Sequence, residues 1–224
     1  MKICREGAFA GLAGALVLCA CSLTTLDPRT CSSNRECQET FGWGSSCGDD
    51  GFCTAVEPHE ACTRTIPEDL FEAPEHYRDH VVIGALYNFD DHLDTLQATE
   101  LALIQVAERG EDAPAEFAMV ACDASTPDGT SADNEVRNAE LADYLANTLD
   151  VYAIVGPRGS ARTIAAWERL ADSDTLLISP SATSPTLTGL DQPNPSDAEP
   201  GRLWRTVPPD TLQAVAIVTD LRNR

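Results

Sequence analysis

Residues 151–185 read VYAIVGPRGSARTIAAWERLADSDTLLISPSATSP, and this stretch decides the fold. An apolar run at 151–156 precedes a segment with Ile164, Trp167 and Leu170 on one side at helical spacing. A second apolar run follows at 175–179 after a few polar residues. A strand, a helix and a strand with short connections form a βαβ unit, whose two strands lie parallel in one sheet.

The same alternation extends toward the N-terminus. Runs 81–86 and 116–123 are predicted strands, and 92–108 and 132–149 are predicted helices. This pattern indicates an α/β domain with a parallel sheet and helices on both faces. The expected apolar positions are Leu93, Leu96, Leu101 and Ile104 in the first helix and Leu141, Leu145 and Leu149 in the second.

Residues 1–20 are predicted to be a leader that is not part of the fold. A basic start with Lys2 and Arg5 is followed by an apolar stretch of small residues that ends in LCAC at 18–21. This ending resembles the bacterial lipobox, which implies cleavage before Cys21 and lipidation of that cysteine. The alternative is an ordinary signal peptide cut nearby. Ser22, directly after the acceptor, favours the outer membrane by the sorting rule of enteric bacteria.

Six of the nine cysteines remain after the leader and Cys21, and an even number in an exported protein indicates disulfides. Four of them follow the spacing C-x5-C-x9-C-x5-C, which lacks the close pairs of a zinc site, so no metal is expected. Four cysteines allow three pairings, of which we favour Cys31–Cys47 and Cys37–Cys53. Cys62 and Cys122 either pair with each other, or Cys122 is a buried free thiol.

Residues 21–62 resemble the small cysteine-rich modules that follow the signal in secreted proteins of myxobacteria-like organisms. So few apolar residues cannot build a core without cross-links. The module is expected to act as a spacer or as an adhesive knob near the membrane. The polar, proline-punctuated residues 63–80 are expected to be a linker.

The net charge of −21 excludes nucleic acid as an expected partner, because phosphate binding needs basic clusters. It is typical of a solvated surface.

Ligands of open parallel sheets bind outside the carboxyl ends of the strands, so the loops after the strands are decisive. GPRGSART at 156–163 places Gly156 and Gly159 where the backbone can approach a neighbour closely. Ser160 stands at the start of the next helix, where it either caps the helix or helps to hold an anion. No phosphate-loop or dinucleotide motif is present, so no cofactor is expected.

SPSATSP at 179–185 presents hydroxyl groups on a loop that Pro180 and Pro185 stiffen. A neutral, fixed cluster of this kind suits a small polar ligand with a carboxylate. It does not suit catalysis, because no G-x-S-x-G elbow surrounds a serine. His92 is also the single candidate base in the α/β region. The sequence predicts a binding protein and not an enzyme.

Three motifs occur in order: G-P-x-x-S from 156, S-P-S-A-T-S-P from 179 and R-T-x-P-x-D-x-x-Q from 205. Together they resemble the first lobe of the type I periplasmic binding proteins, the family of the branched-chain amino acid receptors. The resemblance implies a first lobe at 81–206 and the start of a second lobe at 207–224, so the chain is expected to be a fragment or the product of a truncated gene. It also implies that Ser160, Ser181 and Thr183 hold the ligand's carboxylate.

The function implied is that of a lipid-anchored solute receptor of the cell envelope, located at the outer membrane and facing the periplasm. Its ligand would be an amino acid or a similar small polar molecule, and its partner the permease of an ABC transporter. The alternative is an outer-membrane lipoprotein of the same fold that acts as a sensor or regulator of a cell-wall synthase.

Overall fold

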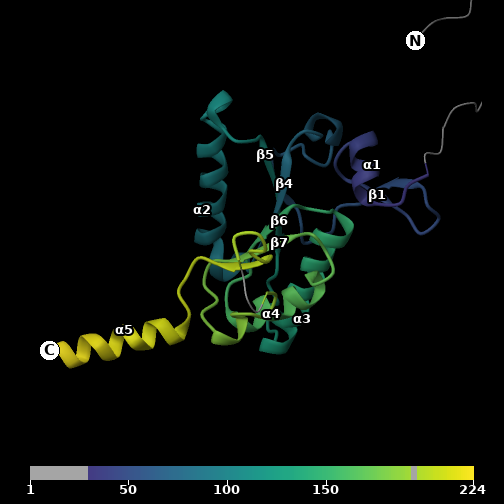
Figure 1. Ribbon diagram of the computed structural model, residues 1–224. Helices are drawn as coiled ribbons and strands as arrows, with labels where there is room; N and C mark the ends of the chain where they lie inside the picture. The colour runs from purple at the N-terminus through teal and green to yellow at the C-terminus, as the bar shows by residue number, and fades with distance from the viewer. Residues whose placement is uncertain (1–29, 193–195) are drawn as a thin grey trace, which may run out of the picture.

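The computed structural model describes residues 30–192 and 196–224. Its centre is a six-stranded sheet with the strand order β3-β5-β4-β6-β7-β8 (Figure 1). All neighbouring strands are parallel except β3, which runs antiparallel to β5 at one edge. The predicted α/β sheet is confirmed, with β3 and β8 as additional strands. The strands are β3 (Arg64–Ile66), β4 (Val81–Tyr87), β5 (Phe117–Asp123), β6 (Ala153–Val155), β7 (Leu176–Ser179) and β8 (Leu203–Arg205).

Helices cover both faces of this sheet, as predicted. Helix α2 (Phe89–Ala107) lies on one face, and α3 (Ser131–Asp143) and α4 (Ser160–Leu170) lie on the other (Figure 1). A π-helical turn, Tyr144–Thr148, continues α3. Successive strand residues point to opposite faces, so each face has its own buried cluster. The α2 side buries Tyr87, Leu96 and Met119, and the other side buries Val82, Leu141, Leu145, Leu149, Ile154 and Trp167.

The residues that helix α2 buries differ from the predicted apolar face. Leu96 is fully buried, but Leu93, Leu101 and Ile104 are 42%, 54% and 48% exposed. The helix packs mainly on β4 and β5, so only the residues that face these two strands are covered.

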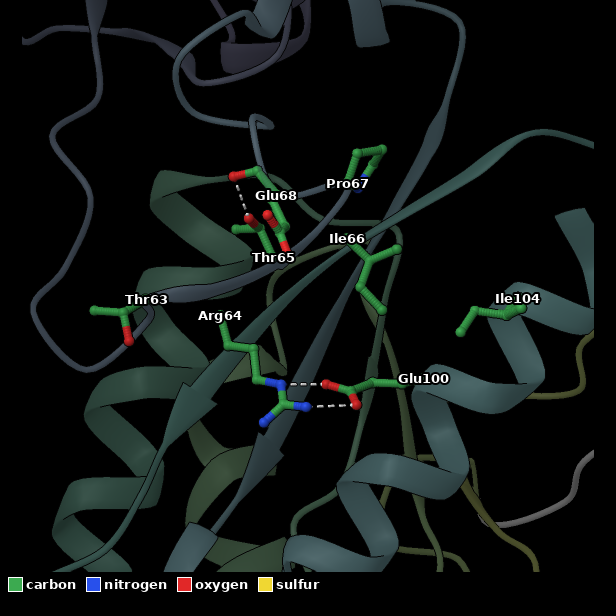
Figure 2. A pocket seen from close by; sticks show the side chains of 8 residues that line it. All are labelled: Thr63, Arg64, Thr65, Ile66, Pro67, Glu68, Glu100 and Ile104. Carbon is green, nitrogen blue, oxygen red and sulfur yellow. Dashed lines mark hydrogen bonds and ion pairs between the residues drawn. The ribbon is translucent and has the colours of Figure 1, made fainter.

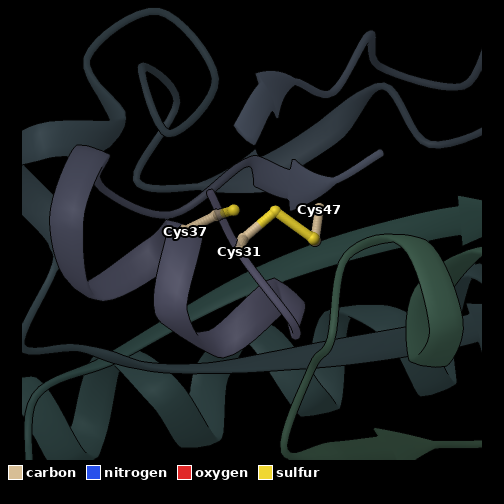
Figure 3. A group of neighbouring side chains, drawn as sticks. All are labelled: Cys31, Cys37 and Cys47. Atoms are coloured by element: carbon tan, nitrogen blue, oxygen red, sulfur yellow. A yellow bond between two sulfur atoms is a disulfide. The ribbon is translucent and has the colours of Figure 1, made fainter. Parts of the chain in front are cut away.

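The cysteine-rich module consists of α1 (Asn34–Phe41), β1 (Ser45–Cys47) and β2 (Cys53–Ala55). It contains the favoured disulfides Cys31–Cys47 and Cys37–Cys53. The sulfur atoms of Cys31, Cys37 and Cys47 lie within 4.8 Å of one another (Figure 3). Metals are bound by thiolates, and all three sulfurs are engaged in disulfides, so this cluster is a cross-link and not a metal site.

The module is docked on the domain by contacts between side chains of α1 and the end of α3. The side-chain amide of Asn34 donates to the carbonyl of Asn147 at 2.8 Å, and that of Gln38 donates to the carbonyl of Leu149 at 2.9 Å. Carbonyls at the end of a helix lack intrahelical partners. The two amides of α1 therefore satisfy the end of the α3 helix and its π-helical turn.

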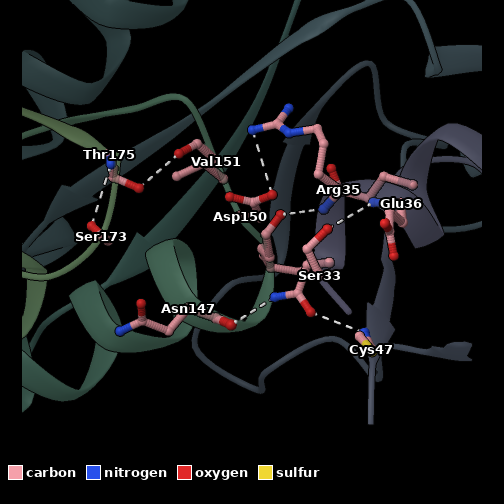
Figure 4. Close-up of polar contacts among 12 residues, drawn as sticks. Ser33, Arg35, Glu36, Cys47, Asn147, Asp150, Val151, Ser173 and Thr175 are labelled. Atoms are coloured by element: carbon pink, nitrogen blue, oxygen red, sulfur yellow. Dashed lines mark hydrogen bonds and ion pairs between the residues drawn. The ribbon is translucent and has the colours of Figure 1, made fainter. Parts of the chain in front are cut away.

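A charged contact lies beside these amides. The guanidinium of Arg35 pairs with the carboxylate of Asp150 at 3.4 Å (Figure 4) and lies 4.3 Å from the ring centroid of Tyr152. Burial raises the pKa of Asp150 above the usual range of aspartate, while Arg35 opposes the shift. The charge of Arg35 thus offsets part of the cost of burying this carboxylate.

The segment 63–80 is not a linker as predicted. Arg64–Ile66 forms the edge strand β3, and Leu70 is fully buried in the main core. A three-residue strand among polar residues shows no periodicity, which is why the sequence does not indicate it. The disulfide Cys62–Cys122 fastens this segment to β5 and decides between the two alternatives for Cys122.

Helix α5 (Asp210–Asn223) projects away from the sheet (Figure 1). None of its residues is buried, and Leu212 and Val215 are 61% and 63% exposed. Across the ranges that the structure covers, no helix combines the length and the apolar character needed to cross a bilayer. The predicted leader and the lipid acceptor Cys21 lie outside the described residues.

Candidate functional site

The strand order reverses at β4: the chain runs from β4 to β5 on one side of it and then crosses back to β6 on the other side. Such a reversal opens a crevice between the loops at the carboxyl ends of the strands. A hollow of about 400 Å³ lies among these loops and the first turns of their helices. It is lined by His92 of α2, Ser131 and Glu135 of α3, Arg158 to Arg162 at the start of α4, and Ser181 after β7.

Two of the three predicted carboxylate-binding residues meet in this hollow. The backbone N–H of Gly159 donates to the hydroxyl oxygen of Ser181 at 3.2 Å. The backbone N–H of Ser184 donates to the hydroxyl oxygen of Ser160 at 3.0 Å. These bonds join the loop after β6 to the loop after β7, so the two loops that the sequence singles out form one unit.

Ser160 does not cap its helix. Gly159 is the N-cap residue of α4, and Ser160 is the first helical residue, with its hydroxyl directed to the neighbouring loop. The first intrahelical bond runs from the N–H of Thr163 to the carbonyl of Gly159. The N–H groups of the first turn are therefore left without helical partners, which suits an anion.

Thr183 does not line the hollow with the two serines. Its carbonyl accepts from the N–H of Asp210 at 2.9 Å, at the start of α5. The structure thus assembles Ser160 and Ser181 and places Thr183 toward α5.

Other hydroxyl groups of this region are structural. Ser179 is fully buried and donates to the carbonyl of Pro157 at 2.7 Å. Thr163, also fully buried, donates to the carbonyl of Gly159 at 2.8 Å, and its hydroxyl lies 3.1 Å from that of Ser179. This buried pair holds the loop before α4 in place by its bonds to the carbonyls of Pro157 and Gly159.

The two glycines of the loop have different roles. At Gly156, with φ of 106°, a side chain would collide with the carbonyl of Leu86. Gly156 is thus required by the packing of β6 against β4 and not by a ligand. Gly159 has φ of 87° and open space around its Cβ position, so glycine there serves the left-handed backbone alone.

Charged residues that the sequence did not indicate complete the hollow. The guanidinium of Arg158 donates to the hydroxyl of Thr95 on α2 at 3.2 Å, which anchors it at the rim. Burial lowers the pKa of His92, and the charges of Arg158 and Arg162 lower it further. The sequence signal that could have indicated these residues is the pair Arg158 and Arg162, which flank Gly159 and Ser160 in a chain with 36 acidic and 15 basic residues.

A larger cavity of about 650 Å³ lies beside the edge strand β3 (Figure 2). Two of its charged groups, Arg64 and Glu100, face each other, with Nη2 of the arginine 2.7 Å from Oε2 of the glutamate. Glu100 thus neutralises the arginine, and the third charged residue of the lining is the acidic Glu68, so the cavity offers no free cation to a ligand's carboxylate. This cavity also lies across β5 and β4 from the loop-lined hollow.

Comparison with known proteins identifies a family to which the chain is similar. A family model described as the receptor family ligand binding region matches residues 95–223. No curated protein matches the chain.

Solved structures are similar at low identity. The branched-chain amino acid transporter substrate-binding protein LivJ of Streptococcus pneumoniae, solved with isoleucine, is 22% identical with a TM-score of 0.46, over 58% of this chain and 34% of that protein. An ABC transporter substrate-binding protein of Desulfitobacterium hafniense is 22% identical with a TM-score of 0.49, over 64% of this chain and 39% of that protein.

This chain thus spans between about a third and two fifths of the length of these proteins. The family model, by contrast, matches more than half of the chain and includes α4, the loop after β7 and α5. The chain belongs to the receptor ligand-binding-region family, whose fold is that of the type I periplasmic binding proteins.

Proposed function

We propose that the protein is an extracytoplasmic solute receptor that binds an amino acid or a similar small ligand by its carboxylate. The observation that carries this proposal is the meeting of Ser160, Ser181 and the free N–H groups of α4 in one hollow. The hollow lies where the strand order reverses, which is the usual ligand position in sheets of this kind.

The geometry of the hollow suits the binding of a ligand better than its catalytic conversion. The two loops are already tied to each other by hydrogen bonds, so little order has to be imposed when a ligand arrives. The hydroxyl oxygens of Ser160 and Ser181 accept from backbone N–H groups, and among the residues that the structure describes neither serine has a base as its hydrogen-bond partner. Activation of a serine as a nucleophile requires such a base.

The wider role follows from the same proposal. The residues 1–20 would direct export, Cys21 would carry the lipid, and the receptor would hand its solute to an ABC permease. The disulfides Cys31–Cys47, Cys37–Cys53 and Cys62–Cys122 support an oxidising compartment.

Calorimetric titration of the full-length protein with a panel of amino acids tests the proposal. We expect at least one member to bind, and Ser181→Ala to weaken that binding by about tenfold, since a hydrogen bond to a charged group contributes about 1.5 kcal/mol or more. Ser46→Ala is the matched control, because Ser46 lies in β1, far from the hollow in the sequence and in a different sheet.

Absence of binding for the whole panel would count against the proposal. If a pulldown from envelope extracts then recovered a cell-wall synthase, the regulator alternative would replace it. Binding that Ser181→Ala leaves unchanged would move the site away from these loops.

A further inference from the structure

We propose that the ligand is an amino acid with an acidic side chain, recognised by Arg158 and Arg162 through its second carboxylate. This inference rests on the proposed function and adds the class of solute. Two arginines and one glutamate line the hollow, whereas the chain as a whole carries a net charge of −21.

The two arginines are available to a ligand. Within residues 30–192 and 196–224, neither Arg158 nor Arg162 takes part in any of the ion pairs. Both line the hollow and are half-buried. In a chain with a net charge of −21, two unpaired guanidinium groups beside one cavity form a local positive field. Burial lowers the pKa of His92, and both arginines lower it further against the opposing effect of Asp91 and Asp94, which agrees with such a field.

The position of Arg162 is electrostatically unfavourable in the free protein. It lies in the first turn of α4, where the helix dipole is positive, and no acidic residue accompanies it there. Helices α2 and α3 instead carry Asp90, Asp91 and Asp133 in their first turns. A bound anion would relieve the repulsion at α4.

The hollow also contains one carboxylate, that of Glu135 on α3. Its fixed charges are therefore two guanidinium groups and one carboxylate. An acidic amino acid carries the complementary set, two carboxylates and one ammonium group. A neutral amino acid such as leucine has no second carboxylate and would leave both guanidinium groups uncompensated, and removal of a charge from water without a partner is costly.

The assignment of groups follows from this match. The α-carboxylate would lie at Ser181 and the N–H groups of α4, and the side-chain carboxylate at Arg158 and Arg162. A planar guanidinium binds a carboxylate through two parallel hydrogen bonds, which gives direction as well as strength.

The test compares each acidic amino acid with its amide, which has nearly the same shape and lacks the charge, and with leucine. Isothermal titration of the full-length protein with L-glutamate, L-glutamine, L-aspartate, L-asparagine and L-leucine should show the acids binding at least about tenfold more tightly than their amides. Arg162→Gln should reduce the affinity for the acid by about tenfold and leave that for the amide unchanged. Arg169→Gln is the matched control, since it removes an exposed arginine from the opposite end of the same helix.

The outcomes separate this inference from the proposed function. If the amides or leucine bind as tightly as the acids, the inference is overturned and the receptor function stands. If Arg169→Gln weakens binding of the acidic amino acid as much as Arg162→Gln does, the effect is one of overall charge and the inference also fails. If no amino acid binds, both are wrong.

Discussion

The backbone N–H of Ser184 donates to the hydroxyl oxygen of Ser160 at 3.0 Å. This bond links the loop after β7 to the first residue of α4, and the bond from Gly159 to Ser181 reinforces it at 3.2 Å. The loops are thus positioned by each other before any ligand is bound. An arrangement of this kind reduces the entropy that binding must spend on ordering the site.

Ser160→Ala should loosen this link. The N–H of Ser184 would lose its partner, and we expect the free energy of unfolding to fall by about 1 kcal/mol, the net contribution of one hydrogen bond. Urea denaturation followed by circular dichroism measures the change. Ser46→Ala, which changes a half-buried serine of β1, should have no comparable effect. Equal stability of Ser160→Ala and the wild type would show that the link does not order the loops.

The alternation of strands and helices was predictable because each long element shows the spacing of apolar residues that is typical of its type, as the helix after β5 does. Leu141, Leu145 and Leu149 recur every four residues, and all three are fully buried. The strand at Arg64–Ile66 was not predictable, since three residues are too few to show alternation and their pairing partner, β5, lies more than fifty residues away.

The site was predictable only in part. Ser160 and Ser181 follow strands whose carboxyl ends meet, so their proximity follows from the topology. The roles of Arg158 and Arg162 depend on what lies opposite them, and a partner such as Thr95 is 63 residues away in the sequence. That information resides in the packing of α2 against the sheet and is not contained in any local pattern.

The ion pair of Arg64 and Glu100 offers a second prediction. Arg64→Met would leave the carboxylate of Glu100, whose side chain is 12% exposed, without a counter-charge. We expect a loss of about 1–3 kcal/mol, at the lower end because the side chain of Arg64 is 44% exposed and water screens the pair. Chemical denaturation measures the loss.

The matched variant is the double substitution Arg64→Met with Glu100→Met. It removes both charges together and should recover most of the stability. If the double variant loses more free energy of unfolding than the two single variants lose together, a structural role for the pair is contradicted.

The docking of the cysteine-rich module depends on Gln38. Gln38→Ala would leave the buried carbonyl of Leu149 without its donor, which costs about 1–3 kcal/mol. We expect faster amide exchange in α1 and at the end of α3, measured by hydrogen–deuterium exchange. Glu39→Ala changes the exposed neighbour and serves as the control. Unchanged protection in Gln38→Ala would mean that the module is held by its other contacts alone.

His92 reports on the charge of the hollow. Burial, Arg158 and Arg162 lower its pKa in the folded protein below 6.5, while the acidic residues Asp91 and Asp94 oppose the shift. Folding therefore favours the neutral imidazole, and this contribution to stability is present above the unfolded pKa and is lost as the pH falls through the window below it. An acidic ligand would offset the arginines and raise the pKa of His92.

NMR titration of the imidazole resonances measures the pKa of His92 in the free and in the ligand-bound protein. His92→Gln assigns the signal among the four histidines of the chain. A pKa that stays the same when the ligand is bound would place the ligand elsewhere.

The most direct test of the account is a crystal structure of the full-length protein with its bound amino acid. We predict a carboxylate within about 3.2 Å of the hydroxyl oxygen of Ser181 and of the N–H groups in the first turn of α4. A ligand bound instead in the cavity beside Arg64 and Glu100, or against the exposed apolar side of α2, would contradict it.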